Sequence, residues 1–165
     1  MDLGLADRVY VLTGASRGLG FATAKALVAD GAKVVIASRD LDRVNEAVTA
    51  LGPNAAGLAA DLAEPTAAQD LVDAARDQFG RFDGALISVG GPARGTAAAM
   101  TDEQWRDAFE TVFLGTVRAA RTFAEALTVG GAIGLVLSSS VREPIAGLGL
   151  SNGLRPGLAA VAKDM

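Results

Sequence analysis

Cysteine and histidine are both absent from the 165-residue sequence. Without cysteine the chain has no disulfide, no thiol nucleophile and no cysteine-ligated zinc. Without histidine it has no Ser-His-Asp triad and no imidazole base or ligand. Aromatic side chains are also few, with one Trp and one Tyr. Proton chemistry must therefore use carboxylates, lysine, tyrosine or hydroxyl groups, and we predict no metal site.

Excess basic charge and long apolar runs are also lacking. The formal net charge is -4 and the isoelectric point is about 4.8, which argues against a broad contact with a nucleic-acid backbone but allows a local basic pocket. No apolar run approaches the roughly 18 residues that span a bilayer, and the amino terminus lacks a basic segment followed by an apolar one. We therefore expect no nucleic-acid partner, no membrane partner and a cytoplasmic location.

Short apolar runs alternate with segments of helical spacing along the whole chain. The apolar runs predict strands at 8–13, 33–38, 55–60, 85–89 and 132–137. The intervening segments predict helices at 18–30, 40–51, 65–79, 101 to about 128, and from 151 onward. In the fourth helix the inner face is expected to carry Trp105, Phe109, Val112 and Phe113. Strands that alternate with helices in this way predict one α/β domain over residues 1–165, a doubly wound parallel sheet covered on both faces.

The most informative segment is T-G-A-S-R-G-L-G, from Thr13 to Gly20, between the first strand and the first helix. Glycines there permit positive φ and let a pyrophosphate approach the backbone, while the helix amino terminus supplies free N–H groups. The position after the first strand favours a dinucleotide site over a plain glycine turn. The residues predicted to bind the cofactor here are Gly14, Ser16, Arg17, Gly18, Leu19 and Gly20.

The spacing T-G-x-x-x-G-x-G resembles that of the short-chain dehydrogenase/reductase family, and the likeness extends along the whole chain. The resemblance implies a Rossmann fold with strand order 3-2-1-4-5, and a homodimer or homotetramer. It also implies that Asp61 and Leu62 lie beside the adenine and that Gly90 follows strand four at the cofactor. Asp61 alone is equally consistent with a capped turn, and Gly90 with a simple loop. The last strands of the family are absent, so we expect the 165 residues to be part of a longer polypeptide.

The residues at the end of the second strand indicate which cofactor is bound. An acidic residue there accepts a hydrogen bond from the ribose 2′-OH, whereas a basic residue neutralises a 2′-phosphate. The sequence has Ser38 and Arg39 at this point, and Arg17 in the glycine turn. We therefore predict NADP(H), with NAD(H) the less favoured cofactor. Asp40 is adjacent, but its better role is the N-cap of the second helix.

The catalytic positions that the family resemblance implies are altered in this sequence. The family uses a Tyr as general acid/base, a Lys four residues later, a Ser that orients the carbonyl and an Asn in the long helix. Ser151 takes the Tyr position, Arg155 takes the Lys position, and Ser139 is the best match for the Ser. Val112 stands where the Asn would be. An alcohol is a poor general acid near neutral pH, while Arg155 can bind ribose hydroxyls but cannot shuttle protons.

Two functions from different classes are compatible with these residues. The first is an NADP(H)-dependent oxidoreductase with a degenerate catalytic tetrad, which transfers hydride between nicotinamide and a small carbonyl or alcohol substrate. The alternative is a non-catalytic NADP(H)-binding sensor or partner subunit of the same fold. The intact glycine turn favours cofactor binding in both cases, and only turnover separates them.

Overall fold

The computed structural model describes residues 3–127 and 130–165 and contains a five-stranded parallel sheet. The strand order is β3-β2-β1-β4-β5, which confirms the predicted doubly wound topology. The strands are β1 (Val9–Thr13), β2 (Lys33–Ser38), β3 (Ala55–Ala59), β4 (Gly84–Ile87) and β5 (Ala132–Leu135). Because β1 lies between β2 and β4, the chain reverses its direction of travel across the sheet at the β1/β4 boundary.

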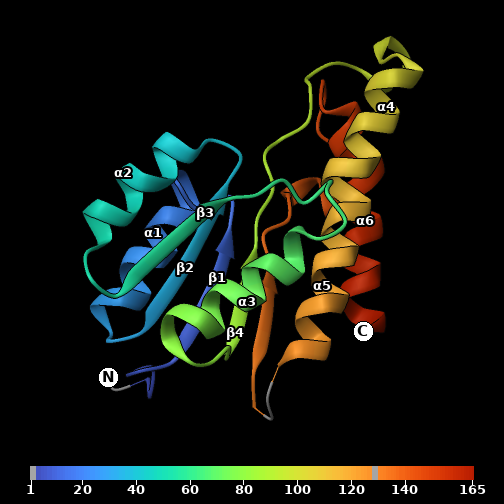
Figure 1. Cartoon of the computed structure of the whole chain (residues 1–165). Coiled ribbons are helices and arrows are strands. Elements are labelled where there is room, and N and C mark those ends of the chain that lie inside the picture. The colour runs from blue at the N-terminus through green and yellow to red at the C-terminus, as the bar shows by residue number, and fades with distance from the viewer. Residues whose placement is uncertain (1–2, 128–129) are drawn as a thin grey trace.

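Helices cover both faces of the sheet (Figure 1). They are α1 (Gly18–Ala29), α2 (Leu41–Leu51), α3 (Ala67–Phe79), α4 (Asp102–Ala108), α5 (Gly115–Ala126) and α6 (Gly149–Asp164). Alternate strand residues face opposite layers: Leu12 and Ile36 pack with α1 and α2, whereas Val11 and Val35 pack with α3 and α5. None of the described helices is long and apolar enough to cross a membrane.

The predicted fourth helix is divided by a π-helical segment, η2 (Phe109–Leu114), between α4 and α5. The prediction of Phe109 on the inner face is wrong, because the residue is 45% exposed and its ring stacks on that of Phe113 with 5.3 Å between ring centroids. A π turn holds extra residues, so it rotates the residues before it relative to those after it. α5 ends at Ala126, and the predicted end near residue 128 lies outside the described residues.

Aromatic rings of this long helix pack against α6. Trp105 and Phe113 belong to a cluster that also contains Leu150, Leu154 and Leu158 of α6. Glycines of α6 make room for the rings. A Cβ on Gly153 would lie 2.8 Å from the ring of Trp105, and one on Gly157 would lie 2.8 Å from the ring of Phe113. The small residues of the final helix thus allow it to pack closely on α4 and η2.

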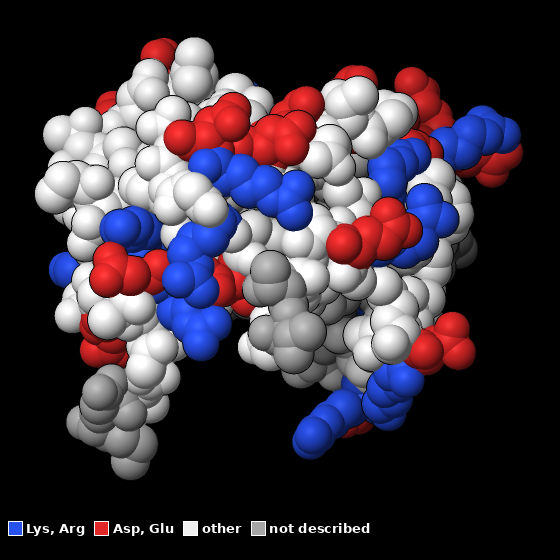
Figure 2. Space-filling view, turned by 60° about the horizontal axis from the view of Figure 1, so that its bottom comes forward, with Lys and Arg blue, Asp and Glu red and all other residues white. Residues whose placement is uncertain are grey.

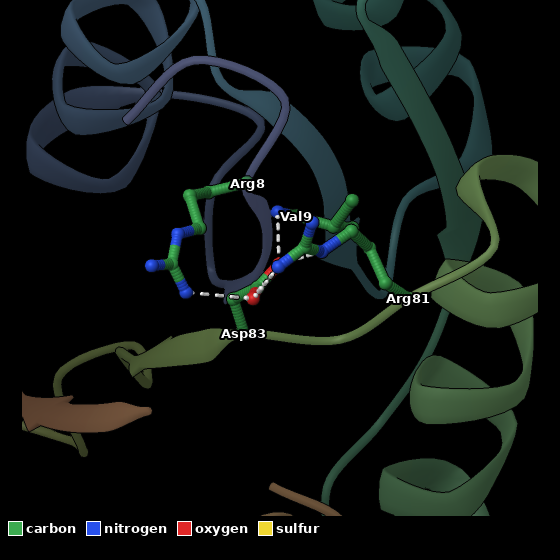
Figure 3. Close-up of polar contacts among 4 residues, drawn as sticks. All are labelled: Arg8, Val9, Arg81 and Asp83. Carbon is green, nitrogen blue, oxygen red and sulfur yellow. Dashed lines mark hydrogen bonds and ion pairs between the residues drawn. The ribbon is translucent and has the colours of Figure 1, made fainter. Parts of the chain in front are cut away.

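The amino ends of β1 and β4 are joined by the carboxylate of Asp83, whose side chain is 2% exposed (Figure 3). It accepts hydrogen bonds from the backbone N–H of Val9 at 2.9 Å, from Arg8 at 3.1 Å, and from the Nε and Nη2 atoms of Arg81 at 2.7 and 2.6 Å. Burial alone would raise the pKa of Asp83, but the hydrogen bonds from Arg81, Val9 and Arg8 outweigh it and lower the pKa. Elsewhere on this side of the molecule, basic and acidic side chains are interspersed (Figure 2).

Candidate functional site

A cleft of about 850 Å³ lies at the carboxyl ends of the strands. Its walls are the segments that follow β1, β2, β3 and β4, together with residues of α4 and η2. All of the residues predicted to bind a cofactor line it: Gly14, Ser16, Arg17, Gly18, Leu19, Gly20, Ser38, Arg39, Asp61, Leu62 and Gly90. Ligands of open α/β sheets bind in this place, outside the carboxyl ends of the strands at the point where the strand order reverses.

The floor of the cleft is held together where β1 and β4 end. The hydroxyl of Thr13 donates to the carbonyl oxygen of Ser88 at 2.8 Å and accepts from the Ser88 N–H at 2.9 Å. Gly14 follows with φ +59°, and a Cβ there would lie 2.6 Å from the same carbonyl oxygen. Glycine is therefore required at residue 14 by both the backbone conformation and the close approach of the two strands.

The amino terminus of α1 faces the cleft without a capping side chain. Arg17 is the N-cap residue, its side chain makes no cap hydrogen bond, and the first turn contains no acidic residue. Gly18 has φ +60°, and open space surrounds the place where its Cβ would be. Backbone N–H groups and a partial positive charge thus face an accessible concave surface. This arrangement fits a phosphate group.

Gly20 has a different reason to lack a side chain. A Cβ there would lie 2.7 Å from the carbonyl oxygen of Gly14 and 2.8 Å from the Cα atom of Ala15. Gly20 therefore lets α1 pack closely on the turn that precedes it, whereas Gly18 leaves space beside the cleft. The glycines of the turn thus serve both the helix packing and the open surface.

Exposed arginines line the cleft close to α2: Arg39 lies two residues before the start of this helix, and Arg17 shares a smaller pocket with it. Arg17 and Arg39 both line it, and Ser38 beside them is half-buried. Asp40 is the N-cap of α2, as predicted, because its Oδ1 atom accepts from the Arg43 N–H at 3.1 Å. Its Oδ2 atom pairs with the Nε atom of Arg43 at 3.1 Å. The carboxylate next to Arg39 is therefore already hydrogen-bonded to Arg43 within the protein.

The segment after β3 forms another wall. The Oδ1 atom of Asp61 accepts from the Ala63 N–H at 3.0 Å, so its carboxylate caps a local turn while it lines the cleft. Leu62 is buried at 7% exposure. Across the cleft, a Cβ on Gly90 would meet open space, so packing within the protein does not require a glycine there.

The predicted catalytic residues lie outside this lining. Ser151 is buried, and its hydroxyl lies 3.3 Å from that of Ser140, while Ser139 is exposed. The structure thus brings Ser140, rather than Ser139, into contact with Ser151. The described residues that line the cleft do not include Ser139, Ser151 or Arg155.

Arg155 is buried at 6% exposure next to the cleft. Its Nη1 atom donates to the carbonyl oxygen of Val136 at 3.0 Å, and its Nη2 atom reaches that of Val89 at 3.5 Å. Both valines line the cleft. Burial lowers the pKa of Arg155, since charge is less favourable away from water. The guanidinium therefore ties together the segments that follow β4 and β5.

Comparison with known proteins identifies the family. The family described as short chain dehydrogenase matches residues 8–150. The chain belongs to this family of short-chain dehydrogenases/reductases. An uncharacterized oxidoreductase of Methylorubrum extorquens is 38% identical over 143 residues, a match that covers 84% of this chain and 57% of the relative.

Solved structures of this family share the fold. The L-sorbose reductase of Gluconobacter frateurii, complexed with NADPH and L-sorbose, has a TM-score of 0.92 at 29% identity, and the match covers 99% of this chain and 65% of that one. A short-chain oxidoreductase of Pseudomonas aeruginosa, described as containing an atypical catalytic center, has a TM-score of 0.91 at 26% identity and covers 98% and 64% of the two chains. The chain therefore spans just under two thirds of these structures.

Proposed function

We propose that this protein is an NADP(H)-dependent oxidoreductase that transfers hydride between nicotinamide and a small carbonyl or alcohol substrate. The observation that carries the proposal is the cleft itself, which every predicted cofactor-binding residue lines and which the uncapped amino terminus of α1 faces. A dinucleotide bound there would supply the hydride chemistry, and the chain would bind and orient it. Gly18 and the α1 amides would hold the pyrophosphate, and Asp61, Leu62 and Gly90 would border the adenosine.

The arginines support a preference for NADPH over NADH. Arg17 and Arg39 line the same end of the cleft, and two guanidiniums suit a 2′-phosphate. The nearby carboxylate of Asp40 is hydrogen-bonded to Arg43, so it is a weaker acceptor for a ribose 2′-OH. The NADPH complex of the L-sorbose reductase is consistent with this choice.

The proposed catalytic groups are Ser139, Ser151 and Arg155. Ser139 would polarise the substrate oxygen, while Arg155 would support the ribose side of the cofactor with its fixed charge. Ser151 occupies the family's tyrosine position, but an alcohol cannot easily be poised to give up a proton near pH 7. The proton would then come from water or from another group of the intact protein.

A specific observation favours the second candidate, a non-catalytic NADP(H)-binding sensor or partner subunit. Ser151 and Arg155 are both buried, and their polar atoms already have hydrogen-bond partners in Ser140, Val136 and Val89. In a sensor or partner subunit, such side chains would stabilise the wall of the cleft without contacting a substrate. We further propose a homodimer or homotetramer in the cytoplasm, and the exposed ring of Phe109 is one apolar group that association could cover.

Fluorescence titration of the intact protein with NADPH and NADH tests the shared premise. We expect NADPH to bind more tightly, and a protein that is folded but binds neither nucleotide at millimolar concentration would rule out both candidates. A panel of carbonyl substrates then separates the two. Consumption of NADPH above background supports the oxidoreductase, whereas tight binding without turnover supports the sensor.

A further inference from the structure

The side chain of Arg118 on α5 connects two walls of the cleft from behind. Its Nη1 atom donates to the carbonyl oxygens of Ala63 at 3.0 Å and Leu62 at 3.4 Å. Its Nη2 atom donates to the carboxylate of Glu110 at 3.2 Å. The arginine side chain is only 20% exposed. One guanidinium therefore joins the segment after β3 to the π-helical segment.

The π-helical segment explains why Glu110 and Arg118 can pair. In a regular α-helix, residues seven apart lie on the same face two turns away from each other. A π bulge adds a residue to the helix, so Glu110 and Arg118, eight apart, occupy equivalent positions. Long side chains then span the two turns. Regular helical periodicity over 101–128 would not reveal this pairing.

The same two walls also touch through their backbones. A Cβ on Gly115 would lie 2.5 Å from the carbonyl oxygen of Leu62 and 3.1 Å from that of Glu110. α5 therefore begins in direct contact with the segment after β3. Arg118 lies one helical turn further along and donates to the same carbonyl oxygen of Leu62. The contact at residue 115 sets the distance, and the guanidinium fixes the orientation of the loop.

Both ends of this connection line the cleft, whereas Arg118 does not. Asp61, Leu62, Ala63 and Glu110 are among the lining residues. The Ala63 N–H donates to Asp61, so the position of Ala63 also determines where the Asp61 carboxylate lies. A guanidinium that holds the Leu62 and Ala63 carbonyls thus controls the shape of this wall without contacting a ligand.

We propose that Arg118 is a positioning residue for nucleotide binding, which sets the wall formed by Asp61, Leu62 and Ala63 against the adenine half of the dinucleotide. This inference rests on the proposed cofactor function. The role of Arg118 differs from the roles proposed for Arg17 and Arg39, because a residue that shapes the adenine wall affects the affinities for NADPH and NADH equally. Arginine suits the task because its planar fork reaches three acceptors at once, which a lysine ammonium on a flexible stem does less well.

Arg118→Gln in the intact protein tests the proposal, with Arg121→Gln as the matched control. Arg121 is exposed on the same helix, one turn away. We expect R118Q to weaken NADPH, NADH and ADP-ribose by about tenfold each, the scale of one lost charged hydrogen bond. Nicotinamide mononucleotide, which lacks the adenine, should bind as it does to the wild type. Arg118→Lys should restore part of the affinity, and R121Q should match the wild type throughout.

Hydrogen exchange supplies a readout that does not need the cofactor. Without the guanidinium, the Ala63 and Glu64 amides, which donate to Asp61, should exchange faster in R118Q than in R121Q. Equal nucleotide affinity in R118Q and the wild type would overturn the inference, as would a loss confined to NADPH. Wild-type protein that binds no dinucleotide would instead refute the proposed function, so the two failures are distinguishable. Should R118Q not fold, the same comparison is made with R118K, for which we expect a smaller, equal loss.

Discussion

Replacing Asp83 with asparagine should destabilise the fold, because it removes a buried negative charge that accepts hydrogen bonds from the Val9 N–H and from the guanidinium groups of Arg8 and Arg81. The carboxylate is 2% exposed, whereas Arg8 and Arg81 are 42% and 48% exposed and would stay hydrated. The cost is therefore below that of a fully buried ion pair, and we expect a loss of about 2–3 kcal/mol. Asp83→Ala should cost about 1–2 kcal/mol more, because it also leaves the buried Val9 N–H without its acceptor.

The loss of stability caused by Asp83→Asn should decrease as the pH falls. The pKa of Asp83 is lowered in the folded protein, so the group binds protons less readily there than in the unfolded chain. Its stabilisation is complete above the unfolded pKa of about 4 and is lost as pH falls through the folded pKa. The difference in free energy of unfolding between wild type and Asp83→Asn should thus be constant from pH 5 to 8 and shrink below about pH 4.

Urea unfolding followed by circular dichroism at several pH values measures this difference, with Asp77→Asn as the control. Asp77 is exposed on α3, so its substitution should change stability by less than about 0.5 kcal/mol. A loss below about 1 kcal/mol for Asp83→Asn at pH 7, or a difference that grows on acidification, would refute the assigned role of the carboxylate.

Four further variants test the cleft. Gly90→Ala should change stability by less than about 0.5 kcal/mol but weaken NADPH binding, because the added Cβ would lie in open space in the cleft. Gly14→Ala should destabilise the fold by about 2 kcal/mol or more, because residue 14 has φ +59° and the added Cβ would lie 2.6 Å from the Ser88 carbonyl oxygen. Thermal melts measure the stability of each variant, and NADPH titrations measure its affinity. Arg39→Ala should weaken NADPH by about tenfold and leave NADH nearly unchanged in parallel titrations, and an equal loss for both would contradict the phosphate role. Ser151→Tyr with Arg155→Lys should raise carbonyl reduction measured by NADPH absorbance if the pocket is otherwise intact, and no gain would point to a differently arranged site.

The predictable part of this structure is the part whose signals are local. Each buried parallel strand is a short apolar run, and each helix has its own period and cap, as Asp40 shows for α2. The glycine turn is also signalled locally by its residue pattern, and the open space at Gly18 agrees with that pattern, whereas the close approach of Ser88 to Gly14 is a contact between strands far apart in the sequence. The predicted cofactor-binding residues that follow the other strands line the same cleft, because parallel strands end at the same edge of a sheet.

The unpredicted part depends on contacts between residues far apart in the chain. Asp83 and Arg8 are 75 residues apart in the sequence, and Arg118 and Ala63 are 55 residues apart. No motif or periodic spacing in the sequence indicates either contact. The π-helical segment has no signal in the sequence, because its residues keep an apolar pattern close to that of an α-helix, and this pattern predicts the wrong orientation for Phe109. The contact between the hydroxyls of Ser140 and Ser151 is likewise not marked in the sequence, because it depends on a short 3-10 turn, η3 (Ser139–Val141), that packs on α6.

The boundary between β1 and β4 is where the cleft floor must be rigid, yet these strands share fewer paired residues than β1 and β2. Side chains compensate at both ends: Asp83 bonds to Val9 at the amino end, and Thr13 bonds to Ser88 at the carboxyl end. Neither Ser151 nor Arg155 takes part in these contacts. Substitutions at these two positions therefore need not disturb the floor on which the proposed nucleotide would lie. Under the proposed function, cofactor affinity and turnover can therefore vary independently, so affinity alone does not distinguish an enzyme from a sensor.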